Sequence, residues 1–546
     1  MVRTILRLKL NPATVLCLAL LPLAAEAGVR VPGFFGDHMV LQRDIPVPIW
    51  GWADPGESVK VKFAGQTAAT KADADGKWML KLKPMKADAA GKILSINDIQ
   101  IKDVVVGEVW ICSGQSNMQF RVDKVLNARQ EIADAKYPGI RQLNMQRTAA
   151  YLPNTNANGE WSVCSPETVG GYTGVGYFFA RKLYKELNIP IGIIDASWGG
   201  TGVEPWIPEI GYRRVPELKK QLDQLDVGLP AGPNGKKKWV GYLAEVEQWL
   251  PGANKQVAEG KLPVNIPKRP SRLPATHHGM TKIFNAVINP LIPYAVRGAI
   301  WYQGESSWGH GPRYFYLKKG LIEGWRTLWN QPPSYARNMP GRDFSFYTVQ
   351  LANLHPYNPK PEGGDGYARI REAQRRCLEL KNNGIAVIHD IGNPSDIHPK
   401  NKQDVGLRLA LWALAKDYPS TTLRAGGKAA DLVYSGPLYE KIEIKGDEAH
   451  IHFTCTGSGL MAGKKNGLEP TKEVKAKIEG FAIAGSDKKW YWADAKVAAD
   501  EKTLIVTSSK VSAPVAVRYA YRWNPMKSNL YNKEGLPAAP FRTDNW

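Results

Sequence analysis

The chain has 546 residues, several times the length of one typical domain, which excludes a single small module. Apolar residues make up 43% and charged residues 23% of the sequence, so a mainly disordered chain is also excluded. The formal net charge of +21 favours anionic partners in general, but only Lys236, Lys237 and Lys238 form a basic run. Because no nucleic-acid-binding motif accompanies this charge, we expect no nucleic-acid partner.

The first 27 residues have the three parts of a secretory signal peptide. A positive start with Arg3, Arg7 and Lys9 precedes a short apolar run, and residues 25–27 match an A-x-A cleavage site. We therefore expect residues 1–27 to be removed and the protein to be exported, to a periplasm or outside the cell. No stretch approaches about 18 consecutive apolar residues, so we expect no membrane span.

Three domains are expected after this segment. Residues 28–104 contain turns and short alternating segments, which predict an antiparallel β domain. In residues 105–420, short apolar strands alternate with helical periods, which predicts a parallel sheet with helices on both faces. Residues 211 to 273 interrupt this pattern with Pro, Gly and Lys and are interpreted as an insertion. Period-two alternation returns in residues 421–546 and predicts a second β domain.

The strands expected in the central sheet are short apolar runs, and the helices between them have one apolar face. The candidate strands are residues 104–111, 191–194, 299–302, 346–351 and 385–388. Two helical faces are predicted from spacings of three and four residues, one with Phe179, Leu183 and Leu187 and the other with Val405, Leu409 and Trp412. Loops at the carboxyl ends of parallel strands form the binding crevice of such a sheet, so the site is expected there.

The first of four unusual loops reads Ser-Gly-Gln-Ser-Asn-Met over residues 113–118. Ser116 stands between a strand and a helix, where its hydroxyl can be exposed while the helix start offers N–H groups to an oxyanion. This is not the G-x-S-x-G elbow, because Met118 replaces the second glycine. Taken alone, the pattern also fits a serine that caps a helix.

The next two loops could supply hydrogen-bond donors. Gly199 and Gly200 allow a sharp turn that aims a backbone N–H into a cleft, although an ordinary tight turn has the same sequence. Gln303 follows the third strand, and its side-chain amide could donate to the same developing negative charge. Glu305 could act as an acid or base, or could organise this loop. The fourth loop contains His398, a candidate general base that a nearby carboxylate could orient.

Together these loops supply, in chain order, a nucleophile, a backbone donor, an amide donor and a base. This is the division of labour in SGNH hydrolases, and the chain resembles the sialate O-acetylesterase family of carbohydrate esterases within that superfamily. The motifs that carry the resemblance lie at residues 107–110, 114–118, 197–201, 301–305, 397–399 with Lys402, 514–520 and 535–543. The resemblance implies an SGNH-hydrolase-like α/β domain with helices on both faces of its sheet, flanked by β-sandwich-like domains at both ends.

The resemblance also implies roles for single residues. Ser116 is expected to be the nucleophile and His398 the base, with the oxyanion bound by Gly200 N–H, Gln303 and the N–H of Ser116 itself. The superfamily often has an aspartate three residues before the histidine, but position 395 is Ser. Asp396 is therefore the expected acid, Asp390 is the second choice, and a Ser-His dyad stays open. The reaction needs no metal or cofactor, so none is expected.

The resulting hypothesis is an exported serine esterase that removes O-acetyl groups from carbohydrate through an acetyl-enzyme on Ser116. O-acetylated sialic acid is the first expected substrate. The alternatives are an esterase for acetylxylan or another glycan, and a protein of another class that binds glycan but is catalytically inactive. Trp198 and Glu305 lie beside the predicted catalytic loops and are the candidate substrate contacts.

Overall fold

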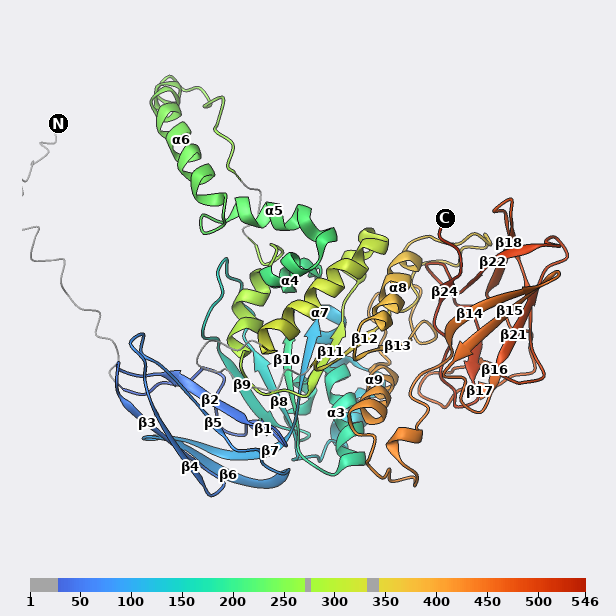
Figure 1. The fold of residues 1–546 in the computed structure, drawn as a ribbon, viewed down its shortest axis with the longest axis horizontal. Helices are drawn as coiled ribbons and strands as arrows, with labels where there is room; N and C mark the ends of the chain where they lie inside the picture. Colours follow the sequence, from blue (N-terminus) through green and yellow to red (C-terminus); the bar gives the residue numbers. More distant parts are fainter. Residues whose placement is uncertain (1–27, 271–275, 331–342) are drawn as a thin grey trace, which may run out of the picture.

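The computed structural model describes residues 28–270, 276–330 and 343–546 (Figure 1). The expected signal peptide, residues 1–27, lies outside the described residues. Among the helices described, none is both long and apolar enough to cross a membrane. Figure 1 shows two β regions at opposite ends of the molecule, with a central sheet and its helices between them.

The central sheet consists of parallel strands in the order β13-β12-β11-β7-β10-β8, with β9 added antiparallel at one edge. The strands are β7 (Ile99–Gly114), β8 (Ile140–Met145), β9 (Gly159–Val163), β10 (Ile191–Ser197), β11 (Gly298–Tyr302), β12 (Ser345–Val349) and β13 (Asn383–Ala386). The predicted parallel sheet is confirmed, with β8 and β9 as additional strands. The sequence of β8 contains Arg141, Gln142 and Asn144 and has no apolar run, so its pattern did not indicate a strand.

Helices cover both faces of this sheet, as predicted. On one face the side chain of Trp110 in β7 packs edge to face against Phe179 of α3 (Gly174–Leu187), which lies beside α9 (Lys402–Asp417). Trp301 of β11 pairs in register with Ser113 of β7. Because side chains alternate between faces along a strand, Trp301 lies on the face opposite to Trp110, where it packs against Trp325 of α7 (Tyr314–Asn330). Further α-helices of the region include α1 (Ser116–Gln119), α2 (Ala128–Ala133) and α8 (Tyr367–Arg376).

The N-terminal β region is joined to the central sheet through β7. Its strands are β1 (Val40–Gln42), β2 (Val47–Trp52), β3 (Ser58–Phe63), β4 (Gln66–Lys71), β5 (Lys77–Leu82) and β6 (Asp88–Ile96). The first half of β7 pairs with β1 and β6, and its second half pairs with β10 and β11. The expected boundary at residues 104 and 105 therefore falls inside one continuous strand. At this junction the buried carboxylate of Glu108 binds Arg43 at 2.5 Å and Arg297 at 2.7 Å.

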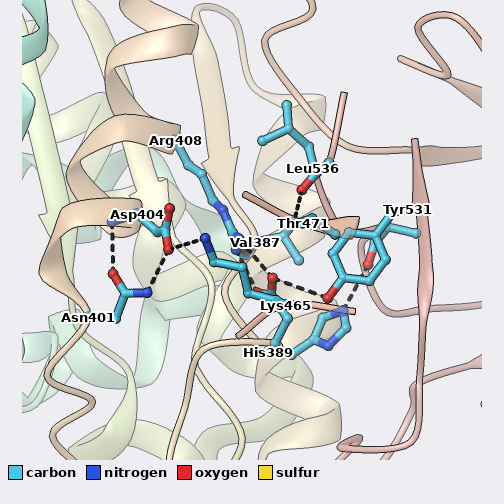
Figure 2. A network of polar contacts seen from close by, with 12 residues as sticks. Val387, His389, Asn401, Asp404, Arg408, Lys465, Thr471, Tyr531 and Leu536 are labelled. Carbon is cyan, nitrogen blue, oxygen red and sulfur yellow. Dashed lines mark hydrogen bonds and ion pairs between the residues drawn. The ribbon is translucent and has the colours of Figure 1, made fainter. Parts of the chain in front are cut away.

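The C-terminal β region has antiparallel ladders and its own hydrophobic core. Its strands are β14 (Leu438–Lys445), β15 (Glu448–Thr454), β16 (Leu460–Lys464), β17 (Lys472–Glu473), β18 (Phe481–Gly485), β19 (Trp490–Trp492), β20 (Asp494–Val497), β21 (Thr503–Thr507), β22 (Pro514–Tyr519), β23 (Leu530–Asn532) and β24 (Phe541–Arg542). Figure 2 shows polar contacts that attach this region to α9, including the ion pair between Asp404 of α9 and Lys465 at 2.8 Å.

The predicted insertion corresponds to a helical arm. It contains α4 (Glu209–Arg214), α5 (Lys219–Gly228) and α6 (Gly235–Ala258), and α6 projects away from the sheet (Figure 1). α4 packs on the body of the domain, where the Cα of Gly211 lies so near α7 that a β-carbon at residue 211 would be 2.2 Å from the Gly320 carbonyl oxygen. Leu225 of α5 is also buried in the main hydrophobic cluster.

Candidate active site

Ser116 stands at the end of the central strand β7, where the chain turns into the short helix α1. A β-carbon at Gly114 would be 2.1 Å from the carbonyl oxygen of Tyr302 in the neighbouring strand β11, and Gly114 has a φ of +134°. Only glycine fits this turn without strain. Gln115 N–H then donates to the same Tyr302 carbonyl at 2.9 Å, which ties the turn to β11 and leaves the Ser116 side chain half-buried.

The structure brings Ser116 and His398 together across 282 residues of sequence. Ser116 Oγ lies 2.9 Å from His398 Nε2. The other ring nitrogen, Nδ1, faces the Asp396 carboxylate at 3.6 Å, and the His398 backbone N–H donates to the same carboxylate at 2.8 Å. A carboxylate beside Nδ1 favours the neutral tautomer with its proton on Nδ1, in which Nε2 can accept from Ser116.

The surroundings of His398 favour its neutral form. Burial lowers its pKa, and the positive charge of Lys402 lowers it further, whereas Asp396 acts in the opposite direction. The ring lies over Phe120 with 6.1 Å between centroids and an interplanar angle of 20°. A neutral imidazole can accept a proton, so this environment suits a general base.

The second candidate acid, Asp390, pairs with Arg408 and not with His398. It forms a buried pair with Arg408 of α9, with oxygen to nitrogen distances of 2.6 and 2.7 Å, and it accepts a longer hydrogen bond from Tyr531 at 3.3 Å. Burial opposes ionisation of Asp390, but Arg408 lowers its pKa overall. Figure 2 shows Arg408 and Tyr531 in this network between α9 and the C-terminal β region. Of the two aspartates, Asp396 is the one that contacts His398.

The glycine pair after β10 lies beside Ser116. A β-carbon at Gly199 would be 3.4 Å from Ser116 Cβ, and Gly199 N–H donates to Gln119 Oε1 at 2.8 Å. Gly200 has a φ of +76° and is exposed. No residue that the structure describes accepts a hydrogen bond from Gly200 N–H. This donor is therefore accessible to a ligand.

Gln303 was expected to donate to the oxyanion, and in this structure its amide group has partners within the protein. Its side chain is completely buried, and its Nε2 donates to Thr201 O at 3.2 Å and to Ser307 Oγ at 2.9 Å. Its Oε1 accepts from the Tyr314 hydroxyl at 2.9 Å, which fixes the orientation of the amide. Both amide hydrogens are engaged, so Gln303 connects the loops after β10 and β11 and does not present a free donor.

Glu305 is also buried, which differs from its expected role as a substrate contact. Burial raises the pKa of its carboxyl group. Its Oε1 accepts from Asn117 Nδ2 at 2.5 Å, and Asn117 in turn contacts Lys402 and the backbone of Ile397. Asn117 was not expected at the site on its own, and Lys402 was expected only as part of a family motif. The adjacency of Asn117 to Ser116 was the available signal.

Trp198 is half-buried and forms a ring stack with the residues that follow the insertion. Its indole lies parallel to the His277 ring, with 4.2 Å between centroids and an interplanar angle of 7°, and His278 lies against His277 at 4.1 Å. Residues that follow the insertion therefore contact the loop that carries Gly199 and Gly200.

Comparisons with known proteins find carbohydrate esterases. The model of the family "carbohydrate esterase, sialic acid-specific acetylesterase" matches residues 106–224. The sialate O-acetylesterases of Homo sapiens and Pongo abelii are each 28% identical to this chain, over 95% of its length and 93% of theirs. A crystal structure of a carbohydrate acetylesterase from Xanthomonas citri is 32% identical, covers 95% of this chain and 100% of its own, and superposes with a TM-score of 0.73.

The chain belongs to the sialate O-acetylesterase family. The predicted resemblance is thus confirmed over nearly the whole chain, and this member of the sialate O-acetylesterase family is a carboxylic ester hydrolase. Within the described ranges, no group of three or more His, Cys, Asp and Glu side chains is arranged to hold a metal ion.

Proposed function

We propose that this protein is a serine esterase that removes O-acetyl groups from carbohydrate, with Ser116 as nucleophile and His398 as general base. The observation that carries the proposal is the 2.9 Å contact between Ser116 Oγ and His398 Nε2 in a half-buried site. An accepting nitrogen at hydrogen-bond distance is what a serine hydroxyl requires to become a nucleophile. The family membership supports the same reaction class.

The reaction proceeds in two halves. Ser116 Oγ bonds to the acetyl carbonyl carbon while its proton passes to His398 Nε2. The tetrahedral intermediate then expels the sugar oxygen, which takes the proton from His398 and leaves as an alcohol. Water attacks the resulting acetyl-Ser116 ester, giving a proton to His398, and collapse of the second intermediate releases acetate and returns the proton to Ser116.

Two backbone donors are proposed for the oxyanion. Gly200 N–H is exposed beside Ser116, and Ser116 N–H stands at the start of α1, where the structure assigns it no backbone acceptor. Donors fixed in advance stabilise the developing negative charge without reorganisation, and loss of one such donor typically costs about 10²- to 10³-fold in rate. Gln303 supports this hole indirectly through its hydrogen bond to Thr201 O.

We propose O-acetylated sialic acid as the preferred substrate, since the mammalian relatives are sialate O-acetylesterases. The bacterial relative is a carbohydrate acetylesterase, which favours a second candidate, acetylxylan or another acetylated glycan. Trp198, stacked on His277 beside the glycine pair, is the proposed aromatic contact for the sugar.

The test is acetate release from O-acetylated sialic acid and from acetylated xylan by the purified chain, compared with Ser116→Ala and His398→Ala. We expect turnover of at least one substrate, lost in both variants while their thermal unfolding is unchanged. Full turnover by Ser116→Ala would contradict the mechanism. Sugar binding without ester turnover by the parent would instead support the inactive glycan-binding protein.

We also propose that the protein is exported, on the strength of the positive start, the apolar run and the A-x-A pattern in residues 1–27. N-terminal sequencing of the protein from its native host should give a mature chain that begins at Gly28. A chain that retains residues 1–27 would contradict the proposal.

A further inference from the structure

A buried polar network lies directly beneath Ser116 and His398. Its centre is Asn117, which is adjacent to the nucleophile and fully buried. Asn117 Nδ2 donates to the Ile397 carbonyl oxygen at 2.9 Å and to Glu305 Oε1 at 2.5 Å, and Asn117 Oδ1 accepts from Lys402 Nζ at 2.5 Å. One side chain therefore contacts the loop after β11, the loop of the catalytic histidine and the start of α9.

Lys402 fixes which way the Asn117 amide points. An ammonium group only donates hydrogen bonds and a carbonyl oxygen only accepts them. Lys402 must therefore face Asn117 Oδ1, which leaves the two hydrogens of Nδ2 for Ile397 O and Glu305. Without Lys402, the amide oxygen would lose the hydrogen bond that connects Asn117 to the start of α9. The Ile397 carbonyl would still accept from Nδ2, but Asn117 would then be held to residues 397–402 at one end only.

The segment of residues 397–402 is attached to Asn117 at both of its ends. The Ile397 carbonyl marks one end, and Lys402 Nζ returns to the same side chain from the other. His398 lies inside this closed segment, one residue from the first attachment. Lys402 itself is held in place, since it is fully buried and its Nζ lies 4.8 Å from the centre of the Phe120 ring and 5.2 Å from that of Tyr302.

We propose that Lys402 is a positioning residue of the hydrolytic site, which acts through Asn117 to keep His398 Nε2 at hydrogen-bond distance from Ser116 Oγ. The inference rests on the proposed function, since it assigns a role relative to the Ser116–His398 pair. Errors of about 1 Å in such a pair cost about 10²-fold in rate, so the fixed segment matters for turnover.

The charge of Lys402 adds a second effect that a purely structural residue would not have. The charged groups around His398 are Asp396 on its own loop, Lys402 on α9 and Lys124 on the segment after α1. Burial lowers the pKa of Lys402 to about 7, with Glu305 and Asp396 opposing that change. Below pH 6.5, where His398 would gain a proton, Lys402 is mostly charged and disfavours that proton. Lys402 therefore extends the activity of the base toward lower pH.

The experiment measures kcat, KM and the pH dependence of kcat/KM for acetyl ester hydrolysis by Lys402→Met and Lys402→Gln. Methionine removes the donor and the charge, whereas glutamine removes the charge and still offers an N–H donor. We expect Lys402→Met to lower kcat by about 10²-fold with KM within about twofold. The acidic limb of kcat/KM should move to higher pH in both variants, and the loss of kcat should be smaller in Lys402→Gln.

Lys318→Met is the matched control. Lys318 of α7 is also fully buried, and its Nζ lies over the rings of Trp301 and Phe346 at 4.3 and 4.2 Å, away from the network around Asn117. This variant should leave the acidic limb in place. The double variant Lys402→Met with Asn117→Ala should lose no more kcat than Asn117→Ala alone, because both changes break one network.

A folded Lys402→Met with kcat within twofold of the parent and an unmoved acidic limb would overturn the inference. If Lys402→Met does not fold, the test is the acidic limb of kcat/KM in Lys402→Gln. An acidic limb at the same pH as in the parent would overturn the inference. An equal shift of the limb in Lys318→Met would also overturn it. Failure of the proposed function has a different signature, namely no ester turnover by the parent or full turnover by Ser116→Ala.

Discussion

Replacing Asp396 by asparagine removes the negative charge nearest to His398 while keeping a side-chain oxygen that can accept the His398 backbone N–H. In the transition state the ring is an imidazolium, and Asp396 Oδ1 lies 3.6 Å from Nδ1. Two unit charges at this separation attract by about 1 kcal/mol in water and by about 5 kcal/mol at an effective dielectric constant of 20. Since the side chains are 44% and 35% exposed, solvent weakens the attraction toward the lower value.

We therefore expect Asp396→Asn to lose about 1.4 to 2.7 kcal/mol of transition-state stabilisation, which is a fall of about 10- to 100-fold in kcat/KM. The assay is initial-rate hydrolysis of 4-nitrophenyl acetate and of an O-acetylated sugar at pH 7.5, with thermal unfolding as the control for folding. A loss of about 10⁴-fold, as for the buried aspartate of a complete triad, would refute the reasoning from exposure. A change of less than twofold would show that the carboxylate does not act on His398.

Three further predictions follow from the site. Because burial and a neighbouring lysine lower the pKa of His398, the acidic limb of kcat/KM should lie below pH 6.5, and a limb above that value would contradict the assignment of the base. Asp390→Asn breaks one side of the buried pair with Arg408 and should lower the free energy of unfolding by about 3 to 5 kcal/mol in chemical denaturation, with kcat of the folded enzyme within about threefold. Trp198→Ala should raise KM for an acetylated sugar by about 3- to 10-fold and leave 4-nitrophenyl acetate hydrolysis nearly unchanged, and equal effects on both esters would argue against a sugar contact.

Much of the fold could be predicted because its signals are local. Apolar runs such as that of β10 mark strands, and the sequence around Ser116 and Gly200 marks the turns that follow them. Parallel strands bring their carboxyl ends to one edge of the sheet, so loops far apart in the sequence could be predicted to lie together. The strand β8 escaped prediction because the fold buries two of its polar side chains, Arg141 and Gln142.

The parts of the site that differ from expectation depend on tertiary contacts. Gln303 carries the right functional group for an oxyanion donor, and in this structure its amide donates to Thr201 O and Ser307 Oγ, so that role stays a prediction. The contact between Asn117 and Lys402 spans 285 residues, and no spacing rule connects two such positions. Sequence patterns thus pointed to Ser116 and His398 as the proposed reacting groups, whereas the contacts around them required the structure.

The strand β7 has a consequence for how this enzyme can be divided. The same 16 residues, Ile99–Gly114, pair with β1 and β6 at one end and lead to Ser116 at the other. The hydrophobic side chains of the N-terminal β region and of the central sheet form one continuous cluster, whereas most of the C-terminal β region packs around a separate one. The N-terminal region is therefore not an exchangeable module. Deleting it would remove β1 and β6 from the first half of the strand that leads to Ser116, and the two parts should melt in a single cooperative transition.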